Sequence, residues 1–504
     1  MRFFDIPVAV NADSYKAPHY SFYDPKIKKM VVYGEFRKPF SESDNRIVAF
    51  GIRHIVENIL NRKWTMEDLV MAEKFYDQHN VGGGKYPWPK HLFMKFILEN
   101  DGYFPVTVKA VPEATVLYPH VPVYTITAEG DYAVLATFLE TAITHYWYPS
   151  TVATKSRHAW QIIKNYFDAT VDPAFMYLLD SRLHDFGMRG ATCLEQALIG
   201  GVAHLLNFVG SDTMNASFWA QFHLNGGKPV ACSIPATEHS IMMSHPNEES
   251  AVDYALSLYG QYGFGLIATV ADTYNYKNFL DVVVPKAWEK FKDKVGTWVI
   301  RPDSGDTVQC VLDGLQALEK ICGVTINDKG YKVINYAAVI QGDGIDINDI
   351  TRILAAITDK NYMFAASNVA FGMGGGLIQK VNRDTMSFAT KLQSLTYEDG
   401  TIRDVMKRPA TDSGKTSLPG EIKVLSANGL PVVFPIEAQV TGEDLLQIVY
   451  DKKPVDVKWP LFDDIKAKLT KDWLAAPPQY DPLSQAMKDK IVAVKARIEK
   501  DLVK

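Results

Sequence analysis

One pattern recurs through the middle of this chain and restricts its fold more than any other feature. A short apolar run ends in a polar cluster that carries an acid, a histidine or glycines, and a helical stretch often follows. The marker residues of these clusters lie 27 to 40 residues apart and are Asp185, Asp212, His239, Asp272, Asp303, Asp343 and Gly374. A strand and its following helix together take about 30 residues or more. The pattern therefore predicts an α/β fold, an irregular (β/α) barrel, in which the markers converge at the mouth formed by the strand ends.

The segments on either side of this region follow different patterns. Residues 1–150 mix strand-like and helix-like stretches, whereas residues 391–504 begin polar, include a strand candidate at Leu430–Pro435 and end in a helical pattern. Because 504 residues exceed what one core usually supports, we expect the barrel to occupy residues 151–390 and both chain ends to form a second, α+β lobe. An open doubly wound sheet is the alternative fold, and it too binds ligands at the carboxyl ends of its strands.

Composition excludes several classes of protein. Apolar residues make up 47% of the chain and charged residues 22%, which is ordinary for a soluble enzyme. The net charge of −5 argues against a nucleic-acid partner, and no apolar run reaches the roughly 18 residues of a membrane helix. The four cysteines form no CxxC pair, and the first residues lack the pattern of a signal peptide. We expect a cytoplasmic protein with no membrane partner.

Three loops carry residues suited to a phosphorylated sugar. Phe371–Gly376 (FGMGGG) could cradle a phosphate or form a plain tight turn, and the cations Lys380 and Arg383 that follow favour a phosphate. Ile300–Asp306 (IRPDSGD) could hold ribose hydroxyls or a Mg²⁺-bound diphosphate, although its acid could simply pair with its arginine. Gln341–Gly344 (QGDG) offers a second acid between glycines.

Two marker residues have simpler alternatives. A lone histidine such as His239 is more often structural, and no HExxH motif surrounds it, so a zinc site is not indicated. Asp212 could merely cap the helix that follows it.

Eight segments in register resemble the nicotinamide phosphoribosyltransferase family, a type II phosphoribosyltransferase family, between Asp13 and about Tyr450. They are Asp13–Lys16 (DSYK) with His19–Tyr20, Trp147–Thr154 (WYPSTVAT), His184–Gly190 (HDFGMRG), Gly210–Thr213 (GSDT), Ser233–Ser240 (SIPATEHS), Ile300–Gly305 (IRPDSG), Val339–Asn348 (VIQGDGIDIN) and Ala370–Lys380 (AFGMGGGLIQK). The resemblance implies that nicotinamide is joined to the ribose 5-phosphate of phosphoribosyl pyrophosphate (PRPP), giving nicotinamide mononucleotide and diphosphate in NAD salvage.

The resemblance also implies how the nicotinamide ring is held. Phe186 and Tyr15 would sandwich the ring, with Tyr15 supplied by the second subunit of a homodimer whose active sites are shared. Asp212 would accept a hydrogen bond from the carboxamide NH₂, and Arg301 would donate one to its carbonyl. Asp13 of the DSYK motif is a further candidate binding residue.

Other residues would hold the phosphates and the ribose. Arg189 would contact the phosphates together with three cations from the partner subunit, which are Arg37, Arg383 and Lys391. The ribose phosphate would be held by Gly342, Asp343, Gly374 and Gly375. Asp303 would hold the ribose hydroxyls and lie near Mg²⁺, which the substrate diphosphate brings, so that no metal is bound by protein side chains alone.

The catalytic residues implied by the resemblance are His239, Asp303 and Asp272. ATP, as a co-substrate, would phosphorylate His239 and so enhance the forward reaction, and Asp272 would orient its imidazole. The family pattern is broken at four positions, which are Met188, Ala268, Ser367 and Ala389.

Three rival functions remain at this point. They are a nicotinate phosphoribosyltransferase, against which the Asp212 carboxylate argues, a non-catalytic nucleotide-binding protein on the same scaffold, and an unrelated barrel enzyme acting on a sugar phosphate. The last leaves the DSYK motif unexplained.

Overall fold

The computed structural model describes residues 6–258, 265–292, 296–407 and 416–502. The chain divides into two compact units. The central unit comprises Lys155–Val381 with Leu461–Asp463, and the terminal unit comprises Met1–Thr154, Asn382–Pro460 and Asp464–Lys504.

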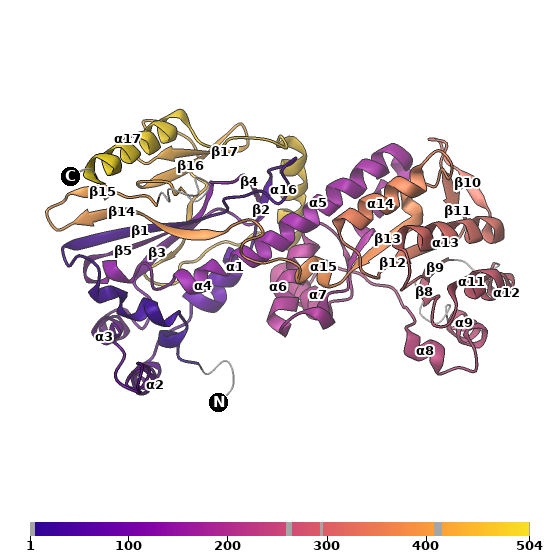
Figure 1. The fold of residues 1–504 in the computed structure, drawn as a ribbon, viewed down its shortest axis with the longest axis horizontal. Coiled ribbons are helices and arrows are strands. Elements are labelled where there is room, and N and C mark those ends of the chain that lie inside the picture. The colour runs from indigo at the N-terminus through magenta and orange to yellow at the C-terminus, as the bar shows by residue number, and fades with distance from the viewer. Residues whose placement is uncertain (1–5, 259–264, 293–295, 408–415, 503–504) are drawn as a thin grey trace. The chain divides into compact units, whose positions relative to one another are not determined.

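A six-stranded parallel sheet forms the middle of the central unit (Figure 1). In chain order its strands are β6 (Leu183–Asp185), β7 (Gly210–Ser211), β8 (Leu266–Val270), β9 (Thr297–Arg301), β12 (Ala337–Gln341) and β13 (Val369–Met373). They lie in the order β7-β6-β13-β12-β9-β8, and each ends at a marker residue or within two positions before one. Strands buried on both faces are apolar throughout. The predicted α/β class is confirmed in the form of this parallel half-barrel sheet.

The third predicted run behaves differently from the others, because the segment before His239 forms no regular strand. Isolated parallel bridges join Gly210 to Cys232 and Ala236 to Ala268, so the segment touches both edge strands of the sheet. Pro235 lies between these bridges and has no N–H to donate to a ladder, which accounts for the interruption.

Helices follow the strands of the central unit. They are α6 (Leu194–Leu205), α7 (Met214–Trp219), α8 (His239–Met243), α9 (Glu248–Ser257), α11 (Tyr276–Asn278), α12 (Val284–Phe291), α13 (Thr307–Cys322), α14 (Ile347–Thr358) and α15 (Gly375–Ile378). Their starts follow from capping side chains. Asp306 accepts the N–H of Gln309 at 2.8 Å before α13, and Asp346 forms a capping box with Asp349 before α14. A two-stranded ribbon, β10 (Val324–Ile326) with β11 (Lys332–Ile334), follows α13.

The terminal unit is built on a six-stranded antiparallel sheet to which both ends of the chain contribute. Its strands, in spatial order, are β15 (Ile402–Asp404), β14 (Ala389–Tyr397), β1 (Ile27–Glu35), β5 (Pro122–Glu129), β3 (Val106–Ala110) and β18 (Gln447–Asp451). Smaller pairs are β2 (Ile47–Ala49) with β4 (Thr115–Leu117) and β16 (Ile422–Ala427) with β17 (Leu430–Pro435). Antiparallel pairing lets segments far apart in the sequence lie side by side, as β1 and β14 do.

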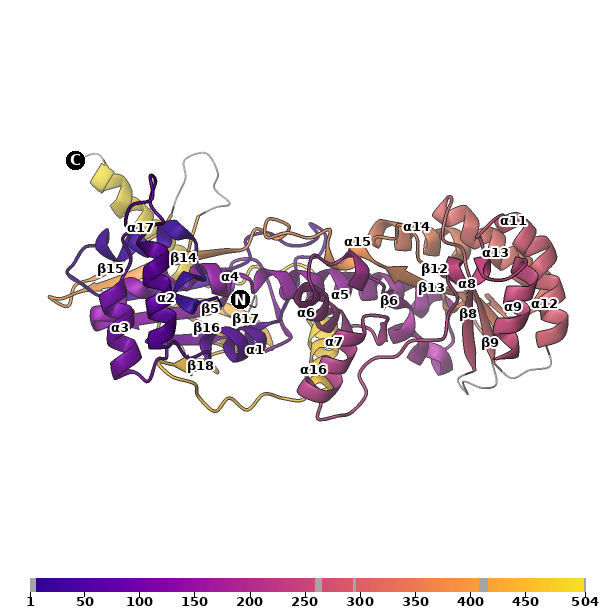
Figure 2. The same ribbon diagram turned by 90° about the horizontal axis from the view of Figure 1, so that it is seen from below.

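Helices complete the terminal unit. They are α1 (Ile52–Ile55), α2 (Met66–Tyr76), α3 (Lys90–Glu99), α4 (Glu140–Thr144), α16 (Phe462–Ala475) and α17 (Gln485–Leu502), and α2 and α3 lie side by side (Figure 2). The long helix α5 (Trp147–Thr170) contains the boundary between the two units. In the part of the chain that the structure describes, no helix is both long and apolar enough to span a membrane.

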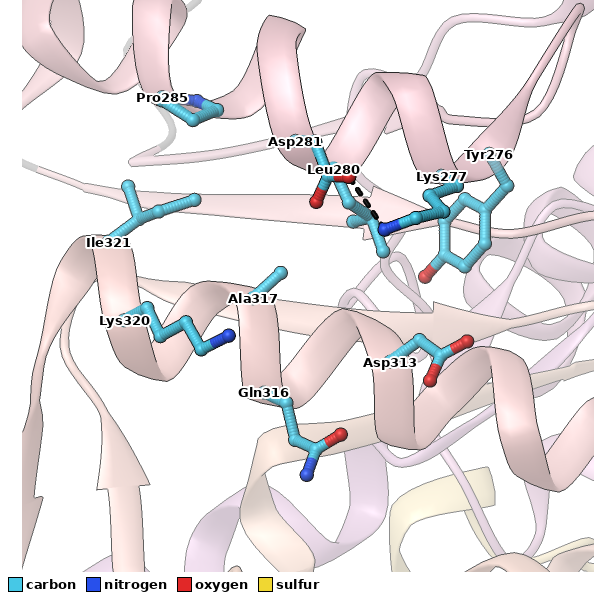
Figure 3. A pocket seen from close by; sticks show the side chains of 10 residues that line it. All are labelled: Tyr276, Lys277, Leu280, Asp281, Pro285, Asp313, Gln316, Ala317, Lys320 and Ile321. Carbon is cyan, nitrogen blue, oxygen red and sulfur yellow. Dashed lines mark hydrogen bonds and ion pairs between the residues drawn. The ribbon is translucent and has the colours of Figure 1, made fainter.

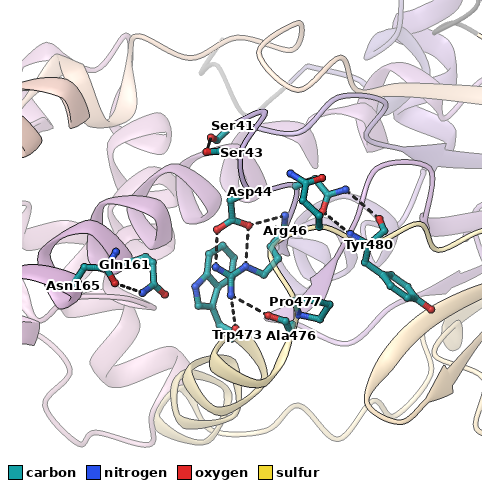
Figure 4. A network of polar contacts seen from close by, with 12 residues as sticks. Ser41, Ser43, Asp44, Arg46, Gln161, Asn165, Trp473, Ala476, Pro477 and Tyr480 are labelled. Carbon is teal, nitrogen blue, oxygen red and sulfur yellow. Dashed lines mark hydrogen bonds and ion pairs between the residues drawn. The ribbon is translucent and has the colours of Figure 1, made fainter. Parts of the chain in front are cut away.

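A buried arginine joins distant parts of the terminal unit (Figure 4). Arg46 donates to both carboxylate oxygens of Asp44, at 2.9 and 2.6 Å, and to the carbonyl oxygens of Trp473 and Ala476, at 2.6 and 3.2 Å. Its guanidinium also lies 4.0 Å from the centre of the Trp473 ring. Because the buried charge is paired and its donors are used, it ties the end of α16 to the chain near β2.

Candidate active site

The central unit contains a cavity of about 770 Å³ where the strands of its sheet end. That volume is in the range of small-molecule sites. Eight of the predicted binding and catalytic residues line it, namely Phe186, Arg189, Asp212, Arg301, Asp303, Gly342, Asp343 and Gly374. They lie at or just after the ends of five different strands, so the sheet brings together residues that are far apart in the chain.

Two glycines make room for the aromatic ring at the base of the cavity. Phe186 follows β6, and its N–H donates to the carbonyl oxygen of Met373 on β13 at 3.1 Å. A Cβ at Gly372 would lie 2.0 Å from Cε2 of the Phe186 ring, and one at Gly342 would lie 3.2 Å from it. Any side chain at Gly372 would therefore displace the ring.

A buried acid precedes this phenylalanine. Asp185 has no exposed surface, and its Oδ1 accepts the N–H of Gly187 at 2.7 Å. Burial raises the pKa of Asp185 to about 6, although the Gly187 N–H and the Thr213 hydroxyl favour its charged form. The sequence pattern predicts only that Asp185 ends a strand, and it does not reveal the burial of this carboxyl.

Asp212 faces the cavity and does not cap a helix. Its Oδ1 accepts the Ser233 hydroxyl at 2.5 Å. Helix α7 begins at Met214, and its cap residue is Thr213, which makes no side-chain capping bond. Burial lowers the pKa of the neighbouring His184, and the charge of Asp212 opposes that shift. Asp212 therefore presents a carboxylate to the cavity, which the capping alternative does not explain.

Asp303 links a cation to the candidate catalytic histidine. Its Oδ1 accepts from Nη1 of Arg301 at 3.3 Å, and its Oδ2 lies 3.4 Å from Nε2 of His239. Arg301 also donates to the carbonyl oxygen of Thr237 at 3.3 Å. The imidazole of His239 is 41% exposed, so a reagent can reach it.

The expected contact between Asp272 and His239 is not formed. Nδ1 of the imidazole lies 3.2 Å from the hydroxyl of Thr273, the next residue along. Oδ2 of Asp272 instead accepts the N–H of Asp303 at 3.0 Å and the hydroxyl of Ser304. Both donors belong to the turn after β9, so Asp272 orders the loop that carries Asp303. The imidazole of His239 is contacted by Thr273 instead.

Gly375 follows Gly374 at the start of α15 and lies just beyond the lining residues. The remaining predicted binding residues belong to the terminal unit. They are Asp13, Tyr15, Arg37, Arg383 and Lys391.

Two of these residues already have partners in the terminal unit, and two are well exposed. Asp13 accepts the Thr141 hydroxyl at 2.7 Å, and Nε of Arg37 donates to the carbonyl oxygen of Ser387 at 3.1 Å. Tyr15 is 57% exposed, and the side chain of Arg383 is 59% exposed.

Lys391 lies among charges of both signs in the terminal unit. Burial lowers its pKa, the charges of Glu140 and Glu35 oppose this, and those of Arg37 and Lys407 add to the lowering. An anionic ligand at this half-buried position would favour the charged form of the lysine.

The positions that break the family pattern lie in different places. Met188 and Ala268 line the cavity, whereas the carbonyl oxygen of Ser367 accepts from Nη1 of Arg182 at 3.0 Å and Ala389 begins β14. Only the first two can change the shape of the cavity directly.

A second hollow, of about 560 Å³, lies between helices α11 and α12 on one side and α13 on the other (Figure 3). Its charged side chains include Lys277 and Asp281, which pair with each other at 2.7 Å and are well exposed. It contains no residue singled out from the sequence. Among the described residues, no group of three side chains is arranged to hold a metal ion.

Sequence comparison identifies two matching regions. Residues 181–451 match the model of the Nicotinate phosphoribosyltransferase (NAPRTase) family, and residues 7–108 match that of the Nicotinamide phosphoribosyltransferase, N-terminal domain.

Two relatives and one solved structure extend this result. The chain is 38% identical to a nicotinamide phosphoribosyltransferase of Xanthomonas campestris pv. campestris, over 82% of this chain and 87% of the relative. It is 28% identical to one of Acinetobacter baylyi, over 91% and 96%. The crystal structure of human nicotinic acid phosphoribosyltransferase is similar in fold, with a TM-score of 0.60 and 17% identity over 95% of this chain and 99% of that one.

Proposed function

This chain belongs to the nicotinate phosphoribosyltransferase (NAPRTase) family, and from that premise we propose that it converts nicotinamide and PRPP to nicotinamide mononucleotide and diphosphate. The names of its relatives and the match to the nicotinamide phosphoribosyltransferase N-terminal domain support nicotinamide as the base. This step salvages nicotinamide for NAD synthesis.

The observation that carries the choice of nicotinamide is the carboxylate of Asp212 at the cavity wall. In the proposed complex the base lies against the ring of Phe186, and Asp212 accepts from its amide NH₂ while Arg301 donates to its carbonyl. Nicotinate would bring a second carboxylate to Asp212. Ser233 holds the Asp212 side chain in place for this contact.

The reaction exchanges one bond at the anomeric carbon for another. N1 of nicotinamide supplies the electron pair for the new C–N bond, and the C–O bond electrons leave with the diphosphate. Asp303 and Asp343 line the cavity at adjacent strand ends, where they can hold ribose hydroxyls, and the backbone of Gly342, Gly374 and Gly375 can approach the 5-phosphate. Positioning and stabilisation of the leaving group's charge account for the catalysis.

Mg²⁺ fits this cavity as an ion that arrives with the diphosphate. The carboxylates of Asp303 and Asp343, which line the cavity, are oxygen ligands of the kind that Mg²⁺ prefers. When bound, the ion neutralises charge on the leaving diphosphate.

We further propose that ATP phosphorylates His239 and that this raises turnover. The exposed imidazole, with Thr273 at Nδ1 and Asp303 near Nε2, supports this role because both contacts fix the ring's orientation. An imidazole nitrogen of His239 would form a bond to the γ-phosphorus of ATP, and the bond to the β,γ-bridging oxygen would break, releasing ADP.

A homodimer with shared active sites would bring Tyr15, Arg37, Arg383 and Lys391 of one subunit to the cavity of the other. One observation supports it, which is an exposed apolar stripe on α7 and on the turn of helix that follows, because such a stripe offers a contact surface. The exposed fractions along the stripe are 77% for Met214, 65% for Phe218 and 56% for Phe222.

We also propose that the segment bridging β7 and β8 completes an irregular barrel and that the terminal unit is the second, α+β lobe. We place the enzyme in the cytoplasm.

One assay tests the proposed function. The purified protein is given PRPP and Mg²⁺ with nicotinamide or nicotinate, with and without ATP, and the mononucleotide product is quantified. Wild-type protein should prefer nicotinamide in kcat/KM. Asp212→Asn should narrow that preference by roughly tenfold, the low end for a like-charge contact, because this carboxylate is partly solvated.

Three results would contradict the proposal. A wild-type preference for nicotinate would favour the rival base, and an unchanged ratio in a folded Asp212→Asn protein would remove this residue from specificity. A lack of product with either base would refute the proposed reaction.

A further inference from the structure

A lysine outside the cavity contacts the glycine-rich turn that contributes to it. Lys155 lies on α5, is 7% exposed, and its Nζ donates to the carbonyl oxygen of Gly376. None of the eight segments that resemble the family includes this residue, and its side chain does not line the cavity.

The ammonium is buried without a carboxylate partner among the described residues. Burial lowers the pKa of Lys155, the charge of Asp346 opposes this, and Lys380 adds to the lowering. Asp346 is already used, because its carboxylate accepts the N–H groups of Asn348 and Asp349 at 2.7 and 3.2 Å. Burying an ammonium group without a paired carboxylate costs free energy, and a nearby anion reduces that cost.

Gly376 also lies close to the loop that carries Asp343. A Cβ at this position would lie 2.5 Å from the carbonyl oxygen of Ile345, which belongs to that loop. The turn is therefore packed against the Asp343 loop and bonded to the Lys155 ammonium, and Gly374 of the same turn lines the cavity.

We propose that Lys155 is a positioning residue for PRPP: it holds Gly376 so that the Gly374–Gly376 turn is ordered for the 5-phosphate, and its charge favours that dianion. This inference rests on the proposed function, since it assigns the turn to the ribose phosphate. The bound phosphate in turn offsets the cost of burying the ammonium.

The test compares Lys155→Met, which removes donor and charge at similar volume, with Lys155→Arg, which keeps both. Lys155→Met should raise KM for PRPP about tenfold, as loss of a charged hydrogen bond predicts, while kcat and KM for nicotinamide change little. Lys155→Arg should recover most of the affinity. Lys164→Met is the matched control, because Lys164 lies on the same helix but pairs with Asp168 at 2.6 Å.

Direct PRPP binding, measured by calorimetry without nicotinamide, separates this inference from the proposed reaction. Weaker PRPP binding by Lys155→Met alone would support the role of Lys155 even if no product formed. Equal PRPP binding by wild type and Lys155→Met, or a loss that arginine does not restore, would overturn it. A lower melting temperature with unchanged KM for PRPP would also overturn it, by making the lysine purely structural.

Discussion

Asp185→Asn should make the stability of the central unit less dependent on pH. In the folded protein the pKa of Asp185 is raised from 3.8 to about 6, a shift of about two units. The folded state therefore keeps a proton between pH 4 and 6 that the unfolded chain has lost. The free energy of unfolding must fall as pH rises through this window. At 1.36 kcal/mol per unit, the loss amounts to about 3 kcal/mol by pH 7.

The asparagine variant removes the titration but keeps an oxygen to accept the Gly187 N–H, which now lies 2.7 Å from Oδ1. Relative to wild type, its free energy of unfolding should therefore rise by about 3 kcal/mol between pH 4 and pH 7. Because the two units can unfold separately, urea denaturation should be combined with a measurement of hydrogen exchange in peptides that cover β6, which reports on the central unit alone.

Asp168→Asn is the control for this comparison, since the Asp168 side chain is 49% exposed and pairs only at the surface. The free energy of unfolding of Asp168→Asn should stay within about 1 kcal/mol of the wild-type value, because an exposed ion pair contributes no more than that. The reasoning fails if the Asp185→Asn difference is constant from pH 4 to pH 7, because the buried carboxyl would then titrate as it does in the unfolded chain.

Three further predictions concern the ring, the dimer and the histidine. Gly372→Ala should cost about 1–3 kcal/mol of stability and raise KM for the base, because its Cβ would collide with the ring of Phe186; equal melting temperatures would contradict this. Mixing Tyr15→Ala with Asp303→Ala protein should restore activity through hybrid sites, and no recovery after confirmed subunit exchange would exclude shared sites. His239→Ala should abolish ATP stimulation and ³²P incorporation from γ-labelled ATP, and labelling that persists would place the phosphate elsewhere.

Strand ends could be predicted from the sequence because their chemistry is local. An apolar run marks each buried strand, and a polar residue follows one or two positions after the strand ends. Asp212, Asp303 and Asp343 were found in this way, and parallel pairing then brings them to one cavity. The strand candidate Leu430–Pro435 has the same bounds as β17.

Contacts between loops could not be predicted, because they depend on the direction of each side chain. Asp272 and Thr273 are adjacent, yet only the threonine reaches His239. The carboxylate of Asp272 accepts a hydrogen bond from the N–H of Asp303 instead. The contact of Lys155 is unpredictable for the same reason, since its partner Gly376 is 221 positions away and accepts through a backbone atom.

The arrangement of the proposed site implies that its two substrates are recognised by separable groups. The base would meet Phe186, Asp212 and Arg301 of the central unit, whereas the phosphates would also meet cations from the partner's terminal unit. Groups that share no partners change free energies nearly independently. Substitutions at Asp212 should thus change the preference for one base over the other without weakening the binding of PRPP. Substitutions at Lys391 should weaken the binding of PRPP without changing the preference for the base. A variant that carries substitutions at both Asp212 and Lys391 should then lose a binding free energy equal to the sum of the losses in the two single variants. A different loss would indicate that the subunits reorganise when either substrate binds.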